Sequence, residues 1–174
     1  MIWQTIVMVI YTAALLLILL YALAQLNLLL NYLRSHRRTD KSAMFDLTDQ
    51  DQIPFVTIQL PVYNELYVME RLLKNIAEID YPKHKLEIQV LDDSTDESFA
   101  QTAAHIIALK SNGLDIQHVT RADRNGFKAG ALKEGLKSAK GEYIAIFDAD
   151  FLPQKDWLYK TIPYFKDRNI GVVQ

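Results

Sequence analysis

The stretch Glu142-Tyr-Ile-Ala-Ile-Phe-Asp-Ala-Asp150 decides the fold class of this chain. Its apolar run is typical of a strand that is buried on both faces, as strands are in parallel sheets covered by helices. Asp148 and Asp150 follow at the carboxyl end of this strand, where open parallel sheets bind their ligands. Two carboxylates one residue apart suit a Mg²⁺ or Mn²⁺ ion that is shared with substrate phosphates. An isolated pair of this kind can equally be a solvated turn, so its meaning depends on the neighbouring strand ends.

The composition limits the class of protein. The chain has 174 residues and a formal net charge of -2, which excludes the broad basic surface typical of nucleic-acid binding. It contains no cysteine, so disulfides and thiolate metal sites are excluded, which fits a reducing compartment. The scattered histidines are interpreted as surface or helix-face residues. They are His36, His84, His105 and His118.

The N-terminal segment has the character of a membrane span. Residues 1–33 contain no Asp, Glu, Lys or Arg, and the segment from Thr5 to Leu30 is mainly aliphatic. As a helix, that segment would be roughly 39 Å long, which exceeds the ~30 Å hydrocarbon core of a bilayer. A secretory signal peptide would need a basic n-region and a small-residue cleavage site, and neither is evident. We therefore predict a transmembrane helix over residues 1–33.

Residues 34–53 form a polar linker that is basic first and then acidic. Its basic residues are Arg34, His36, Arg37, Arg38 and Lys41. Because no basic side chain precedes the span, the positive-inside rule predicts that everything after residue 34 is cytoplasmic. The expected protein is an integral membrane protein of a plasma, inner or Golgi-type membrane.

From Phe55 onward, short apolar runs alternate with segments of helical periodicity. Strands are predicted at 55–60, 86–91, 115–120, 143–147 and 170–173, and helical segments at 66–79, 99–107, 129–139 and 157–165, apart from Pro163 in the last. Gly141 is expected to close the third helical segment. This alternation predicts an α/β domain with a mainly parallel sheet covered by helices on both faces. Because the chain stops inside the fifth predicted strand, we expect an incomplete sheet and a longer parent protein.

Polar loops follow the first two predicted strands. The first is Pro61-Val-Tyr-Asn-Glu65, which is typical of a turn in which Asn64 caps the next helix. Backbone groups of this loop, around Pro61, Tyr63 and Glu65, can also face a nucleotide ring. The second is Asp92-Asp-Ser-Thr-Asp-Glu97. Ser94 and Glu97 match a capping box and Asp96 suits a first helical turn. Asp92 and Asp93 are not explained by helix capping, and either carboxylate can accept a hydrogen bond from a nucleobase N–H.

The loop after the third strand is basic and rich in glycine. It reads Arg121-Ala-Asp-Arg-Asn-Gly-Phe-Lys-Ala-Gly130 and ends at the start of a predicted helix. Exposed amides, a favourable helix dipole and mobile cations there suit an anionic oxygen. Lys128 is the first candidate and Arg124 the second. The alternative is a solvated basic loop.

Together these loops contain a base-accepting carboxylate, cations for phosphate and a carboxylate pair for a metal ion. That combination predicts a site for a nucleotide-diphosphate sugar. The motifs of other enzyme classes are absent from the sequence: Gly-x-Gly-x-x-Gly after a strand, the Gly-Lys-Ser/Thr phosphate loop, the Gly-x-Ser-x-Gly elbow and His-Glu-x-x-His.

Four ordered segments carry a resemblance to a known family. They are Leu60-Pro-Val-Tyr-Asn-Glu65, Gln89-Val-Leu-Asp-Asp-Ser-Thr-Asp96, Arg124-Asn-Gly-Phe-Lys-Ala-Gly-Ala-Leu-Lys-Glu-Gly135 and Ala145-Ile-Phe-Asp-Ala-Asp-Phe151. With these segments, residues 54–174 resemble the membrane-bound family 2 glycosyltransferases, and among them the cellulose-synthase-like mannan and glucan synthases.

This resemblance implies a GT-A fold. It also implies an enzyme that transfers a hexose, with inversion, from UDP-glucose or GDP-mannose to a growing β-linked polysaccharide. It implies that Asp93 contacts the base, that Lys128 lies near the phosphates or base, and that Asp148 and Asp150 hold Mg²⁺ or Mn²⁺. The full predicted donor-binding set is Pro61, Tyr63, Asn64, Glu65, Asp92, Asp93, Arg124, Lys128 and Asp148.

The resemblance also implies that the catalytic base and the Gln-x-x-Arg-Trp acceptor motif would lie beyond Gln174. Residues 54–174 would then be the donor-binding and metal-binding half of a glycosyltransferase domain, and would be inactive alone. Two alternatives stay open. The acceptor could be a lipid, such as a polyprenyl phosphate or a sphingolipid, instead of a glycan. The chain could also be a non-catalytic, membrane-tethered nucleotide-binding module.

Overall fold

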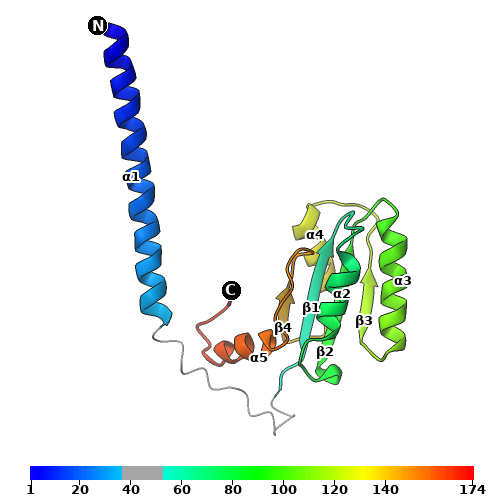
Figure 1. Cartoon of the computed structure of the whole chain (residues 1–174). Coiled ribbons are helices and arrows are strands. Elements are labelled where there is room, and N and C mark those ends of the chain that lie inside the picture. Colours follow the sequence, from blue (N-terminus) through cyan, green and yellow to red (C-terminus); the bar gives the residue numbers. More distant parts are fainter. Residues whose placement is uncertain (37–52) are drawn as a thin grey trace. The chain divides into compact units, whose positions relative to one another are not determined.

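The computed structural model describes residues 1–36 and 53–174, which belong to two separate units (Figure 1). The first unit is a single helix and the second is an α/β domain. Most of the predicted linker, including the basic residues at 37, 38 and 41, lies outside the described residues.

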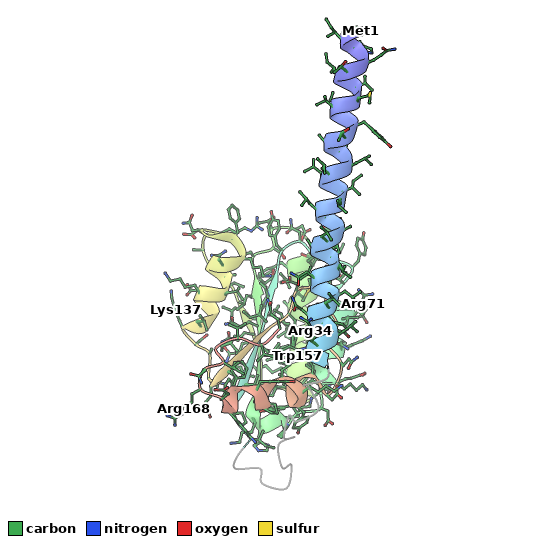
Figure 2. All side chains as sticks on the ribbon, turned by 90° about the vertical axis from the view of Figure 1, so that its left-hand side faces the viewer. Met1, Arg34, Arg71, Lys137, Trp157 and Arg168 are labelled. Atoms are coloured by element: carbon green, nitrogen blue, oxygen red, sulfur yellow. The ribbon has the colours of Figure 1, made fainter. Side chains whose placement is uncertain are left out.

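Helix α1 (Ile2–His36) is the N-terminal unit. Every side chain from residue 1 to 34 is exposed, and Figure 2 shows side chains projecting on all sides between Met1 and Arg34. Among the described residues, α1 is the one helix long and apolar enough to cross a membrane, over Ile2–Arg34. Asn31 Nδ2 donates to Asn27 Oδ1 at 3.1 Å, so these two polar side chains satisfy each other within the helix. Its length and apolar surface fit a membrane anchor.

The domain is built on a four-stranded parallel sheet. Its strands are β1 (Val56–Val62), β2 (Leu86–Asp92), β3 (Ile116–Val119) and β4 (Tyr143–Ile146), in the order β3-β2-β1-β4. All three pairings are parallel. The carboxyl ends of all four strands therefore meet at one edge of the sheet. Four of the five predicted strands are confirmed, with ends that differ by at most two residues.

Helices cover both faces of the sheet, as predicted (Figures 1 and 2). Helices α2 (Met69–Ala77) and α3 (Ser98–Ser111) pack side by side on one face, and α4 (Phe127–Leu136) lies on the other. Right-handed crossovers explain this arrangement. The steps from β1 to β2 to β3 move one way along the sheet, whereas the step from β3 to β4 moves back past two strands.

The two faces of the central strands differ in chemistry. Alternate residues of β1 and β2 are aliphatic and form the core with α2, including Ile58, Leu72 and Ile88. On the other face of these strands lie buried polar side chains, those of Thr57, Gln59, Glu87 and Gln89. Glu87 is fully buried, and its carboxylate accepts hydrogen bonds from Thr57 Oγ1 (2.7 Å), Gln117 Nε2 (2.8 Å) and the Lys140 N–H (2.9 Å). These donors offset the cost of burying the carboxylate.

The predicted fifth strand at 170–173 does not form, so that prediction is wrong. The Ile170 N–H closes a turn onto the Asp167 carbonyl at 3.0 Å, and Val172 is exposed. A strand exists only through ladder hydrogen bonds with a neighbour, and these residues make none with β4, which is left as an open edge. The helix predicted at 157–165 is also shortened. It divides into α5 (Trp157–Thr161) and the 3-10 helix η4 (Ile162–Lys166), in which Pro163 cannot donate a helical hydrogen bond.

Gly141 does not close a helix, because α4 ends at Leu136. Instead, the chain passes close to β1 at this position. The Gly141 N–H donates to Thr57 Oγ1 at 2.9 Å, and a Cβ on Gly141 would collide with the backbone N of Thr57 and the carbonyl of Tyr143. Gly141 is therefore required for the close approach that starts β4 beside β1.

Gly141→Ala is expected to lower the free energy of unfolding by about 1–3 kcal/mol, because the added methyl group has to displace buried backbone. Gly171→Ala is the matched control, since a Cβ there meets nothing within 4 Å. The control should stay within about 0.5 kcal/mol of wild type. Urea unfolding of the chain in detergent micelles measures both values, and equal stability of the two variants would contradict this account.

Candidate functional site

A pocket of about 420 Å³ opens at the carboxyl edge of the sheet. Eight of the residues predicted from the sequence line it. They are Pro61, Tyr63, Glu65, Asp93, Arg124, Lys128, Asp148 and Asp150. These side chains come from all four strand ends, so the parallel sheet brings together segments that lie far apart in the sequence. Asn64 and Asp92 are not among the lining residues.

Buried and exposed side chains alternate at the end of β4, and this alternation continues past it to Asp148 and Asp150. Phe147 and Ala149 are buried, whereas the two carboxylates between and after them are exposed at the pocket. The Phe147 N–H still donates to the Gln59 carbonyl at 3.2 Å, which holds this segment against β1. The chain then turns, since the Phe151 N–H donates to the Asp148 carbonyl at 3.0 Å, and both carboxylates line the same pocket.

Lys128 lies in the first turn of α4, and its ammonium donates to Asp148 Oδ1. Both side chains are about half exposed. The helix begins after Gly126, which has φ +74°, and Phe127, which has φ +47°, so the chain turns sharply before Lys128. An exposed ion pair is weak and exchangeable. The Asp148 carboxylate is thus positioned to bind a cation.

The charge of the pocket fits a divalent metal ion. Its lining holds four carboxylates, of Glu65, Asp93, Asp148 and Asp150, against the two cations of Arg124 and Lys128. Even when Arg121, which pairs with Asp93 from outside the lining, is counted, a formal excess of one negative charge remains and would repel a diphosphate. Asp148 and Asp150 offer the oxygen ligands that Mg²⁺ and Mn²⁺ prefer, and neither ion needs a complete protein cage. Among the described residues, no group of three or more His, Cys, Asp or Glu forms a metal cluster.

Asp93 is held by an arginine that the sequence interpretation did not single out. Arg121 Nε donates to Asp93 Oδ1 at 2.7 Å, and Nη2 donates to Oδ2 at 2.5 Å. Leu91 pairs with Val119, so Asp93 and Arg121 each lie two residues beyond a paired position. This register is the signal that could have identified Arg121, but it becomes readable only once the two strands are aligned. The hydrogen bonds with Asp93 raise the pKa of Arg121.

Arg124 lies beside an aromatic ring. Its guanidinium carbon is 3.3 Å from the centroid of the Tyr63 ring, and its Nε is 3.8 Å from Asp93 Oδ2. The guanidinium therefore gains a cation–π contact and a long ion pair. At 38% exposure, the Arg124 side chain is much more accessible than the 7% exposed Asp93.

Asn64 links two loops instead of capping a helix, so the predicted cap is wrong. The N-cap of α2 is Val68, which makes no capping hydrogen bond. The Asn64 N–H donates to Ser94 Oγ, and its Oδ1 accepts from the Thr95 N–H, both at 2.9 Å. Its backbone has φ 56°, a left-handed conformation that asparagine tolerates better than most residues.

The capping box predicted for Ser94 and Glu97 is also absent. Helix α3 begins at Ser98, and its N-cap Glu97 makes no side-chain capping bond. Asp96, which precedes the helix, satisfies its first backbone donor instead, since Asp96 Oδ1 accepts from the Ser98 N–H at 3.0 Å. Ser94 lies outside the N-cap position, which Glu97 occupies, and its Oγ instead accepts from the Asn64 N–H.

Asp92 is buried below the pocket edge, where its Oδ2 lies 2.8 Å from His118 Nε2 and its Oδ1 accepts from the Ser94 N–H. His118 is on β3 and packs against the ring of Phe99, so its assignment to the surface or a helix face is wrong. Burial raises the pKa of Asp92, but the hydrogen bonds from His118 and Ser94 outweigh it and leave this pKa below its usual value. Asp92 thus has structural partners and does not face the pocket.

Residues 57–174 match the family described as Glycosyl transferase family 2. The chain belongs to this family. It is 43% identical over 129 residues to probable glucomannan 4-beta-mannosyltransferase 7 of Oryza sativa subsp. japonica, covering 71% of this chain and 22% of the relative. Glucomannan 4-beta-mannosyltransferase 1 of Cyamopsis tetragonoloba is 34% identical over 165 residues, covering 88% of this chain and 31% of the relative.

Solved structures of glycosyltransferases share the fold. Mannosyltransferase PcManGT from Pyrobaculum calidifontis, in complex with GDP-Man and Mn²⁺, has a TM-score of 0.64 and 36% identity, covering 82% of this chain and 41% of that protein. S. aureus TarS 1-349 has a TM-score of 0.56 and 25% identity, covering 69% and 38%. The domain therefore has the GT-A fold of cellulose-synthase-like family 2 proteins. The chain spans less than a third of the length of the curated relatives described above.

The lowered pKa of Asp92 predicts how stability depends on pH. A carboxyl with a lowered pKa in the folded state stabilises the fold fully above its ordinary pKa of 3.8, and this contribution is lost as the pH falls through the lower value. Asp92→Asn should cost about 1–3 kcal/mol of unfolding free energy at pH 6. The difference from wild type should shrink below pH 4. Urea unfolding across this pH range measures it, and a difference independent of pH would contradict the assignment.

Proposed function

We propose that this chain carries the donor-binding part of a glycosyltransferase that uses GDP-mannose and a divalent metal ion to extend a β-linked glycan. The observation that carries the proposal is the pocket at the carboxyl edge of the sheet, where a carboxylate pair, a lysine and an aspartate–arginine–tyrosine group converge. The names of the relatives, which are glucomannan 4-beta-mannosyltransferases, support mannose as the sugar. The GDP-Man and Mn²⁺ bound to PcManGT support the donor and the metal.

In this proposal, the nucleobase binds at the end of the pocket formed by Asp93 and Tyr63. A carboxylate is an acceptor only, so it suits the ring N–H groups of a base. Guanine offers two adjacent N–H groups on one edge, whereas uracil offers one. Pro61 and Glu65 lie in the same loop as Tyr63 and complete this end of the pocket.

The diphosphate binds between Lys128 and the carboxylate pair. Lys128 and Arg124 supply mobile positive charge, and Lys128 lies at the N-terminal end of α4, where the helix dipole favours anions. Asp148 and Asp150 would hold Mg²⁺ or Mn²⁺, which neutralises charge that builds on the leaving diphosphate. The ammonium of Lys128, released from Asp148, could then pair with a phosphate oxygen.

The transfer itself is proposed as a single displacement with inversion, in which the described residues bind and orient the donor. The group that accepts the proton of the acceptor hydroxyl is expected in sequence beyond Gln174, which the greater length of the relatives supports. Helix α1 anchors the enzyme in a membrane. The basic residues after it favour a cytoplasmic domain, with segments at 1–33, 34–53 and 54–174 as predicted from the sequence.

Asp148→Asn and Asp150→Asn should each weaken Mn²⁺-dependent binding of GDP at least roughly tenfold, because each removes an anionic ligand of the metal ion. Asp156→Asn is the matched control, since Asp156 pairs with Lys160 and does not line the pocket. Isothermal titration calorimetry with and without Mn²⁺ measures the effect. Wild-type affinity in both pocket variants would refute the metal site.

The donor is tested by titrating the chain with GDP and with UDP in Mn²⁺. GDP should bind at least about tenfold more tightly, since one extra hydrogen bond to a carboxylate contributes roughly 1.5–3 kcal/mol. A preference for UDP would assign a UDP-sugar to the same site. If neither nucleotide binds more tightly with metal than without it, the proposed site is wrong.

A further inference from the structure

Arg121 forms an unusually complete set of hydrogen bonds at the edge of the donor pocket. Two of its N–H groups donate to the carboxylate of Asp93 as a bidentate pair, from Nε to Oδ1 at 2.7 Å and from Nη2 to Oδ2 at 2.5 Å. The other two bonds reach the start of α4, from Nη1 to the Asn125 carbonyl just before the helix at 2.6 Å and from Nη2 to the carbonyl of its first residue, Phe127, at 2.8 Å. A guanidinium has five N–H donors, so these bonds leave little capacity for a ligand.

The surroundings of Arg121 hold the guanidinium in one place. Its side chain is only 12% exposed, and that of Asp93 is 7% exposed. A Cβ on Gly130 would collide with the Asn125 carbonyl oxygen and with Arg121 Nη1, so the first turn of α4 closes the remaining side. The two carbonyls flank Gly126, whose φ of +74° allows the chain to turn there. The guanidinium is therefore fixed by packing and by the backbone as well as by Asp93.

The two arginines near Asp93 have different environments. Arg124 is 38% exposed, lines the pocket and approaches Asp93 only to 3.8 Å. Arg121 is nearly buried, contacts Asp93 closely and is not among the residues that line the pocket. Because Arg121 already neutralises Asp93, Arg124 is free to move toward an anionic ligand.

We propose that Arg121 is a positioning residue for nucleotide recognition, which fixes the Asp93 carboxylate in the single orientation that accepts the N–H groups of the base. The inference rests on the proposed function, since it requires Asp93 to face a nucleobase. A bidentate arginine orients a carboxylate plane, whereas a lysine supplies only a point charge. The effect of Arg121 should therefore depend on its geometry and appear only with ligands that carry a base.

The test measures the affinity of the chain, in detergent micelles, for GDP and for inorganic pyrophosphate, both with Mn²⁺. Arg121→Met should weaken GDP binding roughly 10- to 100-fold, by analogy with the loss seen when the hydrogen-bond partner of a metal-binding residue is removed. Arg121→Lys should also weaken it, by at least about fivefold, because the fork is lost although the charge is kept. Pyrophosphate affinity should change less than about threefold in both variants. Lys133→Met, a lysine in the cleft on the other side of Arg121, is the control and should bind both ligands as wild type does.

Asp93→Asn and the double variant Asp93→Asn/Arg121→Met separate positioning from a general loss of structure. The double variant leaves no unpaired buried charge, so it keeps the test valid if Arg121→Met alone is poorly folded. Positioning predicts that the double variant binds GDP within about threefold of Asp93→Asn, since Arg121 then has no carboxylate to orient.

Additive losses in the double variant would overturn the inference, as would unchanged GDP affinity in Arg121→Met. Equal losses for GDP and pyrophosphate would also overturn it, because they indicate only a damaged fold. A wild-type chain that fails to bind GDP with Mn²⁺ would instead refute the proposed function. These outcomes are distinguishable, since the last concerns wild type alone.

Discussion

The parallel alignment of the four strands is the constraint on which the rest of the domain depends. Because all pairings are parallel, every strand delivers the loop that follows it to the same edge of the sheet. The crossover from β3 back to β4 puts β4 beside β1 and separates α4 from α2 and α3. The pocket is a consequence of this topology, since ligands of open parallel sheets bind where the strand order reverses.

Three carboxylates inside the domain, those of Glu87, Asp92 and Asp93, are paired, and their partners fix the geometry at and below the pocket edge. Glu87 and its donors support the sheet beneath α4, and Asp92 with His118 supports it near the pocket edge. Asp93 is held in turn by Arg121. A buried charge is tolerated only when partners compensate its lost hydration, so each of these contacts also fixes a geometry. The exposed pair of Lys128 and Asp148 lacks this constraint and can be exchanged for a ligand.

Much of the fold could be predicted from local pattern. Apolar runs identified β1 to β4 because strands inside a covered sheet are short and largely apolar, and helical spacing identified α2 to α4 because each helix turns one side toward the sheet. The predictions that failed concerned features that contacts with other segments of the chain decide. The segment at 170–173 has the composition of a strand but no neighbour to pair with, and Ser94 does not cap α3 because that helix begins only at Ser98, with Glu97 as its N-cap. Gly141 was interpreted as a helix end, but a glycine is needed there because the backbone of Thr57 leaves no room for a Cβ.

By itself, the sequence determined the α/β class, the apolar N-terminal helix and the set of polar residues that follow the strands, because hydrophobic periodicity and turn chemistry are local properties. Only the tertiary structure decided which of those residues share the pocket. It separated Asp93, which lines the pocket, from the adjacent Asp92, which pairs with His118 below it. It also joined Arg121 to Asp93. Neighbouring residues at the end of a strand face opposite sides, and which side becomes the pocket depends on where the other strands and helices pack.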